Sequence, residues 1–416
     1  MTQYKIHTTR YKKHITRRKK HTIKHKKHKT KYKIYNLNYK TQNKTNKINK
    51  ISIINGGAYI GKGSNGCVFR PSITGTILET ETILESSISN ISKIINKGNI
   101  KNEYNTDIIN ILINCDPGYK YLVYPIAITS IDQTEFDKNK IYFENCNTDG
   151  VEQHNVQNPY DKHDNSFQIE TSNLEAFNNA HVNIIQPYGG DIVKANIKLY
   201  DLLNVFKGVL LFNTYGLCHK DLKIDNLVDT ITGLNFFGYF VSHNIRIIDF
   251  STMCKITDFT IAQIFIGDSN FYYNWMPFEY NWFINNNYND VVAEPKKNIP
   301  FTQYIDSLDD SLFRICDKTD WLLTVIYEIN IMKNSIKDTE VTNQVATTFD
   351  VYSLGIILSI WLVNNNIINI KPQIIKFIKS LTKVIRPTIY EATTQFLAIL
   401  LDYKHNILQK IYTTWS

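Results

Sequence analysis

Apolar residues are distributed along this 416-residue chain in patterns that predict both strands and helices. Short β-branched runs at 91–95 and 245–248 are typical of strands, whereas the segment 319–332 has apolar residues at near-helical spacing. The longest apolar run, at 351–363, is shorter than the roughly 20 residues that span a bilayer. The pattern therefore predicts both strands and helices, and no transmembrane segment.

The first 50 residues differ in composition from the rest of the chain. They contain 18 of the 47 Lys and Arg residues and no Asp or Glu, which leaves 29 basic against 38 acidic residues from residue 51 onward. Because this segment has no apolar period, it cannot bury enough surface to fold, and we predict a basic disordered tail over residues 1–51. Such a tail could bind nucleic acid or an acidic surface non-specifically, act as a nuclear localisation signal, or serve only as a solubilising extension.

The cysteine pattern and the N-terminus bear on the cellular compartment. The six cysteines are Cys67, Cys115, Cys146, Cys218, Cys254 and Cys316. None of them forms a C-x-x-C pair, so the sequence predicts neither a disulfide framework nor a zinc site and favours a reducing environment. No early apolar segment resembles a signal peptide, and we therefore expect a soluble intracellular protein.

Three glycines form a pattern at the start of the expected fold, in "AYIGKGSNGCVF" (58–69). The short apolar runs on either side predict a strand, a turn and a second strand. Glycines at this spacing let the backbone approach a polyphosphate closely and donate its N–H groups. No helical pattern follows, so we expect a hairpin over a phosphate group rather than a Rossmann turn. The residues of this predicted site are Gly61, Gly63, Gly66 and Val68.

A second concentration of polar chemistry is the loop "HKDLKIDN" (219–226), which lies between apolar stretches. About one hairpin later, the strand-like run "IRIIDFS" (245–251) contains Asp249 near its end. The amide of Asn226 and the carboxylate of Asp249 supply the hard oxygen ligands that Mg²⁺ prefers. Two such ligands, together with phosphate oxygens, predict a site for magnesium and a polyphosphate.

These three motifs resemble, in the same order, the Gly-rich loop, the H-R-D-x-K-x-x-N catalytic loop and the D-F-G motif of eukaryotic-type protein kinases. The composition and further segments extend the resemblance over nearly the whole chain after residue 55, and they are most similar to the divergent serine/threonine kinases of large DNA viruses. These segments are "ISKII" (91–95) for the strand of the phosphate-binding lysine, "IIQPYGGDI" (184–192) for the hinge, "WMPFEY" (275–280) for A-P-E, "FDVYSLGIIL" (349–358) for the buried helix, and "IRPTIYEA" (385–392) for the arginine that pairs with the A-P-E glutamate.

The resemblance implies a bilobal, protein-kinase-like fold. A small β-rich N-lobe with one helix would cover residues 52–187, and a larger, mainly helical C-lobe would cover residues 188–416. Each lobe contains a segment too long for an ordinary connection, a polar insertion at about 127–180 and a second insertion at about 283–348. The second insertion includes the segment 319–332 and should add helices to the C-lobe.

The resemblance also implies ATP and Mg²⁺, or Mn²⁺ in its place, as cofactors, and it assigns catalytic roles. Asp221 would accept the proton of the substrate hydroxyl, and Lys223 would neutralise the γ-phosphate. Lys93, held by Glu103, would contact the α- and β-phosphates. An ordinary surface lysine and an exposed helical glutamate are the alternative interpretations of this pair. The metal would be held by Asn226 and Asp249.

The resemblance further assigns the nucleotide-base site and the support of the loop. In the hinge, Gln186 would be the gatekeeper, and the adenine edge would be lined by Pro187, Tyr188 and Gly189. His219 would be structural and would tie the loop to Asp350 and Phe250.

Two positions depart from the kinase pattern. Ser251 replaces the glycine of D-F-G, and Lys220 replaces the arginine of H-R-D, which weakens the usual grip on a phosphorylated activation loop. We expect a serine/threonine kinase acting on a protein substrate, located in the host cytoplasm or virion if viral, or in the nucleus through its basic tail. The alternatives are a weak or inactive pseudokinase scaffold, whose tail binds nucleic acid or acidic surfaces, and a kinase of small molecules.

Overall fold

The computed structural model describes most of the chain after residue 57, and the statements below concern the described residues. These are residues 58–63, 66–70, 72–73, 76–80, 90–152, 167–193, 197–232, 242–259, 276–277, 279, 310–335, 338–365 and 372–415. Contacts divide the chain into two units, residues 1–53 and 54–416, and every described residue lies in the second unit. The predicted tail, 1–51, and the first part of the predicted insertion at 283–348 lie outside the described residues.

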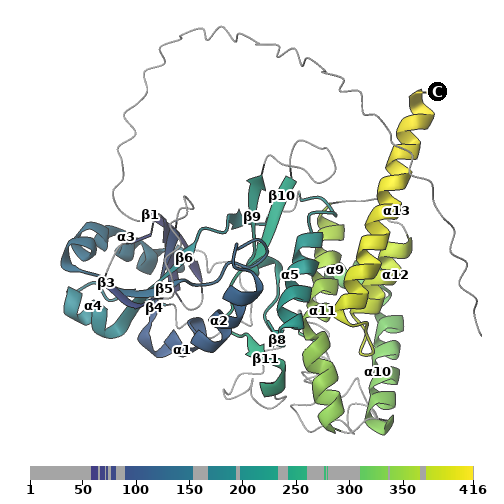
Figure 1. Cartoon of the computed structure of the whole chain (residues 1–416), viewed down its shortest axis with the longest axis horizontal. Coiled ribbons are helices and arrows are strands. Elements are labelled where there is room, and N and C mark those ends of the chain that lie inside the picture. Colours follow the sequence, from purple (N-terminus) through teal and green to yellow (C-terminus); the bar gives the residue numbers. More distant parts are fainter. Residues whose placement is uncertain are drawn as a thin grey trace, which may run out of the picture. The chain divides into compact units, whose positions relative to one another are not determined.

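The N-terminal part is built around a six-stranded antiparallel sheet with the strand order β1-β2-β4-β6-β5-β3 (Figure 1). β1 and β2 pair as the predicted hairpin, with Gly61 opposite Val68 and Gly63 opposite Gly66. At Gly66 a Cβ atom would lie 2.3 Å from the carbonyl oxygen of Ile94 in β4, so only glycine fits there. The strands are β1 (Ala58–Gly63), β2 (Gly66–Arg70), β3 (Thr76–Thr80), β4 (Asn90–Asn96), β5 (Ala127–Ser130) and β6 (His181–Pro187).

Two helices from the predicted polar insertion at 127–180 pack on one face of this sheet. The insertion begins with the sheet strand β5 and continues with α3 (Gln133–Glu152) and α4 (Leu174–Ala180). Along α3, a buried stripe with spacings of three and four residues matches the period of a helix. The stripe meets residues of β2 and β4 in a small separate core, formed by Cys67, Phe69, Ile73, Ile94, Ile131, Phe136, Phe143, Cys146, Phe167, Ile169 and Phe177.

A disulfide joins Cys67 of β2 to Cys146 of α3, with the two Cα atoms 6.3 Å apart. The expectation of no disulfide is therefore wrong for this pair, because the spacing of cysteines along the chain does not show which of them meet across a sheet–helix interface. Close to this bond, the Lys62 Nζ atom donates a hydrogen bond to the Cys146 carbonyl oxygen at 3.2 Å. The other described cysteines, Cys115, Cys218, Cys254 and Cys316, are free.

Removing the disulfide is expected to lower the free energy of unfolding by about 2–4 kcal/mol, because the bond restricts the unfolded chain. Urea unfolding followed by circular dichroism would compare the wild type, with and without reductant, to Cys146→Ala. Cys115→Ala, which removes a free half-buried thiol, is the control. Because it keeps the disulfide, reductant should destabilise it as much as the wild type. Unfolding of the wild type that is unaffected by reductant would contradict this prediction.

Two short helices lie between β4 and β5 of the sheet. The strand β4 leads into α1 (Ile100–Glu103) and α2 (Thr106–Cys115). Between the two helices, the side chain of Asn105 accepts a hydrogen bond from the backbone N–H of Ile108 at 3.3 Å and caps α2. This interruption leaves Glu103 at the end of α1, and its side chain is buried.

The C-terminal part is mainly helical. The predicted helical segment 319–332 lies within α10, and the predicted buried helix 349–358 lies within α11, which confirms both expectations. α5 packs against α13 and against β10, one strand of a small three-stranded sheet with the order β10-β9-β7. The helices are α5 (Leu203–Thr214), α9 (Asp310–Ile315), α10 (Lys318–Ser335), α11 (Asp338–Asn364), α12 (Pro372–Leu381) and α13 (Ile389–Trp415). The strands are β7 (Asp191–Ile192), β9 (Leu227–Thr232) and β10 (Ser242–Ile247), together with a β8–β11 pair, Leu217–Cys218 and Cys254–Lys255.

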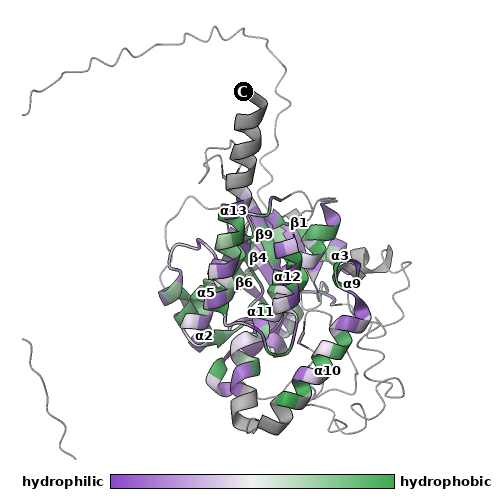
Figure 2. Cartoon of the chain, turned by 90° about the vertical axis from the view of Figure 1, so that its right-hand side faces the viewer, coloured by the Kyte–Doolittle hydropathy of each residue, from purple (hydrophilic) through white to green (hydrophobic). Residues whose placement is uncertain are grey.

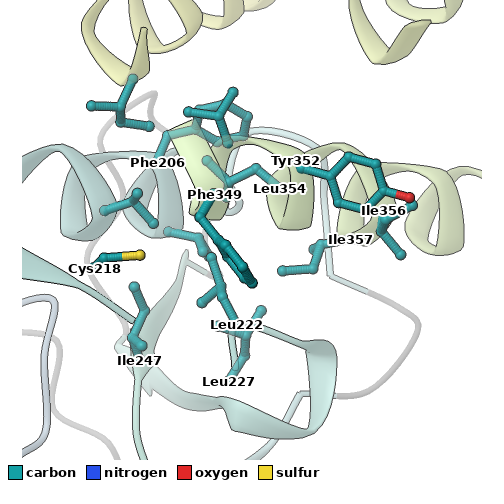
Figure 3. Packing of buried hydrophobic residues seen from close by; sticks show 14 of the residues in the cluster. Phe206, Cys218, Leu222, Leu227, Ile247, Phe349, Tyr352, Leu354, Ile356 and Ile357 are labelled. Atoms are coloured by element: carbon teal, nitrogen blue, oxygen red, sulfur yellow. The ribbon is translucent and has the colours of Figure 1, made fainter. Parts of the chain in front are cut away.

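The helix α11 forms the centre of this part. Its segment Asn343–Asn364 is the one described helical stretch long and apolar enough to cross a membrane, but 89% of the most apolar window is buried inside the protein. Figure 2 shows that the helices around α11 carry both hydrophobic and hydrophilic residues along their length. Figure 3 shows Phe349 of α11 directed toward Leu222, within the polar loop 219–226, and Leu227, directly after it. The chain is thus a mixed α+β protein, with an antiparallel sheet in its N-terminal part and helices in its C-terminal part.

Candidate functional site

A buried carboxylate of α11 binds the backbone of the polar loop 219–226. Asp350 accepts hydrogen bonds from the backbone N–H groups of His219 and Lys220, at 2.8 and 3.1 Å. Burial raises the pKa of Asp350, although these bonds and the nearby His219 act in the opposite direction. Leu222 is fully buried, so the loop inserts an apolar side chain into the core, whereas its charged residues are half-buried or exposed. The loop therefore has a fixed shape.

Three predicted site residues of this loop contact one another. The Lys223 Nζ atom lies 3.0 and 3.2 Å from the two carboxylate oxygens of Asp221. The Asn226 Nδ2 atom donates hydrogen bonds to the Asp221 carbonyl oxygen at 2.7 Å and to its Oδ2 atom at 3.1 Å. Because the amide nitrogen makes these bonds, the amide oxygen is the atom with which Asn226 could bind a cation.

Asp249 is brought beside this loop by the strand β10. The backbone N–H of Ile248 donates to the Asn226 carbonyl oxygen at 3.0 Å, so the residue before Asp249 is bonded to the end of the loop. Asp249 has φ +62° and Lys220 has φ +65°. This left-handed region costs a residue with a Cβ atom roughly 1–2 kcal/mol, and such strain is concentrated at functional sites.

His219 connects the loop to the segment that carries Asp249. Its ring lies 5.4 Å from the ring of Phe250, and its Nε2 atom is 3.2 Å from the Ile248 carbonyl oxygen. The hydroxyl of Thr252 donates to the His219 carbonyl oxygen at 2.8 Å. Together with the bond from its backbone N–H to Asp350, these contacts confirm the predicted structural role of His219.

A second charged group forms at the sheet. The Lys93 Nζ atom of β4 lies 2.6 Å from Glu103 Oε2 and 4.0 Å from Asp249 Oδ1. The predicted pairing of Lys93 with Glu103 is confirmed, and the alternatives of a surface lysine and an exposed glutamate are wrong. Burial lowers the pKa of Lys93, but Asp249 and Glu103 outweigh this effect and the net shift is upward. The ammonium group therefore stays charged at neutral pH.

Asp249 also remains charged. Burial alone would raise its pKa, but the charge of Lys93 and the hydrogen bonds from Ser251 lower it, and the net shift is downward. The Ser251 hydroxyl donates to Asp249 Oδ1 at 2.8 Å, a contact that the sequence indicated only as a departure from glycine. An ionised carboxylate and an amide oxygen are suitable ligands for Mg²⁺. Within the described ranges, no group of three or more His, Cys, Asp or Glu could hold a metal, so phosphate and water oxygens would have to complete the coordination.

The glycine-rich hairpin and the end of β6 are aligned with Lys93 by strand register. Val68 of β2 pairs with Lys93, which in turn pairs with Ile184 of β6. Gln186 stands opposite Ile91, two residues before Lys93, so Gln186 and Lys93 share one face of the sheet. The other predicted base-site residues, Pro187, Tyr188 and Gly189, follow directly at the end of β6 and in the linker after it.

A buried ion pair lies among the helices of the C-terminal part. The Arg386 guanidinium contacts the carboxylate of Glu279, and both side chains are almost completely buried. This confirms the pairing expected between the A-P-E-like motif and "IRPTIYEA". Arg386 also donates hydrogen bonds to Thr348 Oγ1 at 3.1 Å and to the Lys383 carbonyl oxygen at 2.7 Å.

Comparison of the sequence with protein-family models and with curated proteins found no match. The interpretation of the site therefore depends on the chemistry and the geometry of its residues.

Proposed function

We propose that this protein is a bilobal serine/threonine protein kinase that transfers the γ-phosphate of ATP to a protein hydroxyl. One observation carries the proposal. Three segments of the sequence, 93–103, 219–226 and 248–249, bring a paired lysine, two oxygen ligands for a cation and a carboxylate base together around the Ile248–Asn226 backbone bond. Phosphoryl transfer needs this combination, because it depends on positioning and charge neutralisation more than on covalent chemistry.

In this proposal, the sheet is the N-lobe and the helical part is the C-lobe, with ATP bound where the two meet. The backbone N–H groups of the β1–β2 hairpin and the ammonium group of Lys93 would bind the phosphates. Glu103 orients Lys93 and keeps it charged. Asn226 and Asp249 would hold Mg²⁺, which supplies neutralisation of the charge that develops on the phosphate oxygens.

Asp221 and Lys223 would act on the transferred group and the acceptor. Asp221 accepts the proton of the serine or threonine hydroxyl while the bond between the γ-phosphorus and that oxygen forms and the bond to the β-phosphate oxygen breaks. Lys223, whose Nζ atom forms an ion pair with Asp221, would neutralise the γ-phosphoryl oxygens. A lysine at this position is also the feature that resembles serine/threonine rather than tyrosine kinases.

The test is incorporation of labelled γ-phosphate from Mg·ATP into the protein itself and into a basic protein, followed by phosphoamino-acid analysis. The wild type is expected to label serine or threonine. Lys93→Met should reduce labelling at least about tenfold, because it removes a charge-assisted contact to the phosphates. Lys97→Met, at an exposed lysine after β4, is the matched control and should leave labelling unchanged.

A second function, that of an ATP-binding scaffold without transfer activity, is favoured by the contact of the Ser251 hydroxyl with Asp249. That bond occupies one of the two lone pairs of the Oδ1 atom and so competes with a metal ion for this oxygen. Binding of Mg·ATP by a wild type that transfers no phosphate would support the scaffold. Absence of both binding and transfer would overturn both functions.

A further inference from the structure

Arg246 is a buried arginine that none of the roles above explains. It lies in β10 between Ile245 and Ile247, which are both fully buried in the main core. Because side chains alternate along a strand, Arg246 projects from the opposite face of β10. Its residue is only 7% exposed, which is unusual for an arginine and requires a set of partners.

The guanidinium of Arg246 binds three separate segments of the chain. Its Nη2 atom donates to the Gly189 carbonyl oxygen at 2.5 Å and to Thr230 Oγ1 at 3.1 Å. Its Nη1 atom donates to the Tyr119 carbonyl oxygen at 3.3 Å. These acceptors belong to the linker after β6, to β9 and to the turn after α2. One side chain thus joins the linker to two elements that surround it.

Two carboxylates offset the cost of burying this charge. Burial lowers the pKa of Arg246, while Asp116 and Asp229 act in the opposite direction. Asp116 is itself fixed, because it accepts hydrogen bonds from the backbone N–H groups of Tyr121 and Leu122 at 2.7 and 2.8 Å. A planar guanidinium can reach several acceptors at once, which the single ammonium group of a lysine does less well.

The linker lies directly against β9, so the position of its backbone is narrowly defined. Gly190 has φ +119°, and a Cβ atom there would lie 2.1 Å from the Asp229 carbonyl oxygen. On the other side of Gly189, the Tyr188 ring is covered by the Arg70 guanidinium at 3.6 Å, and its hydroxyl bonds to Asp191. The linker is therefore held at two successive residues, by Arg70 on the ring of Tyr188 and by Arg246 on the carbonyl oxygen of Gly189.

We propose that Arg246 is a positioning residue for the nucleotide base, which fixes the Gly189–Gly190 peptide group and thereby the course of the linker backbone along the edge of the base. This inference rests on the proposed function. Pro187, two residues earlier, has no backbone N–H to offer, so the linker has few donors and depends on the orientation of those that remain. The class of ligand is a purine nucleoside triphosphate, recognised in part through its base.

The experiment compares two ligands, Mg·ATP and Mg·tripolyphosphate, which shares the phosphates but has no base. Isothermal titration calorimetry would measure both affinities for the wild type, Arg246→Met and Arg246→Lys. Arg246→Met should weaken ATP binding about tenfold, the loss expected when one hydrogen bond between the linker and the base is no longer well placed, and leave tripolyphosphate binding unchanged. Arg246→Lys should recover part of the loss. Arg314→Met, at an exposed arginine of α9, is the control and should bind like the wild type.

Each result decides the proposal. Unchanged ATP affinity in a folded Arg246 variant, or an equal loss for both ligands, would overturn the role of Arg246 and leave the kinase proposal standing. Absence of ATP binding by the wild type would overturn the proposed function and this inference with it. Thermal unfolding of each variant is measured first, and Arg246→Lys carries the comparison if Arg246→Met does not fold.

Discussion

Asp221→Asn is expected to lower the rate of phosphoryl transfer by about 10³-fold, because the asparagine cannot accept the proton of the substrate hydroxyl. The amide has nearly the same shape as the carboxylate, so it can still bind the neighbouring Asn226 and Lys223 groups, which lie 3.0 to 3.2 Å from the side-chain oxygens of Asp221. Affinity for Mg·ATP should therefore change little. Single-turnover transfer of labelled phosphate, with nucleotide affinity measured in parallel, separates the two quantities.

The same loop provides a matched control for this substitution. Asp225 lies four residues after Asp221 and is exposed. Asp225→Asn removes the same charge from the loop and should leave the transfer rate within about twofold of the wild type, because exposed charges interact weakly. Equal rates for the two variants would show that Asp221 is not the base.

Arg386→Met is expected to lower the free energy of unfolding by about 3–5 kcal/mol, because it leaves the buried Glu279 carboxylate without its partner. Burial lowers the pKa of Arg386 to about 9, so the guanidinium is still charged at neutral pH and the pair is ionic. The substitution also removes the bonds to Thr348 and to the Lys383 carbonyl oxygen. Urea unfolding at neutral pH, followed by circular dichroism, measures the change.

A double variant and a surface pair test whether burial is the cause. Arg386→Met combined with Glu279→Gln should be less destabilised than the sum of the single changes, because no unpaired buried charge remains. Lys138→Met breaks an exposed pair with Glu135, 3.4 Å apart on α3, and should cost less than about 1 kcal/mol. A similar cost for Lys138→Met and Arg386→Met would contradict the argument.

Local sequence patterns predicted the parts of the site that depend on neighbouring residues. The glycines of the hairpin, the strand around Lys93 and the loop 219–226 each carry their own periodicity or turn chemistry, and each forms the expected element. The pairing of Lys93 with Glu103 was predicted from the resemblance of motifs, since ten residues separate them and the helix that carries Glu103 has only four residues.

Contacts between distant segments could not be predicted in the same way. The hydrophobic period of α3 is hidden in a polar segment, and nothing in the sequence pairs Cys67 with Cys146 across 79 residues. Arg246 looks like an exposed strand residue, because its partners are two backbone carbonyls and a hydroxyl, which leave no signal in the sequence. Such partners become visible only when the linker and the turn after α2 are placed beside β10.

The attachment of the glycine-rich hairpin to α3 has a consequence for how a nucleotide would enter and leave. The disulfide and the bond from Lys62 to the Cys146 carbonyl join both strands of the hairpin to the same helix. The hairpin therefore cannot move independently of α3. Opening over a bound nucleotide would instead require rotation of the sheet and its helices together, with the linker after β6 as the axis. Release of product would then be governed by a domain motion rather than by the mobility of a loop.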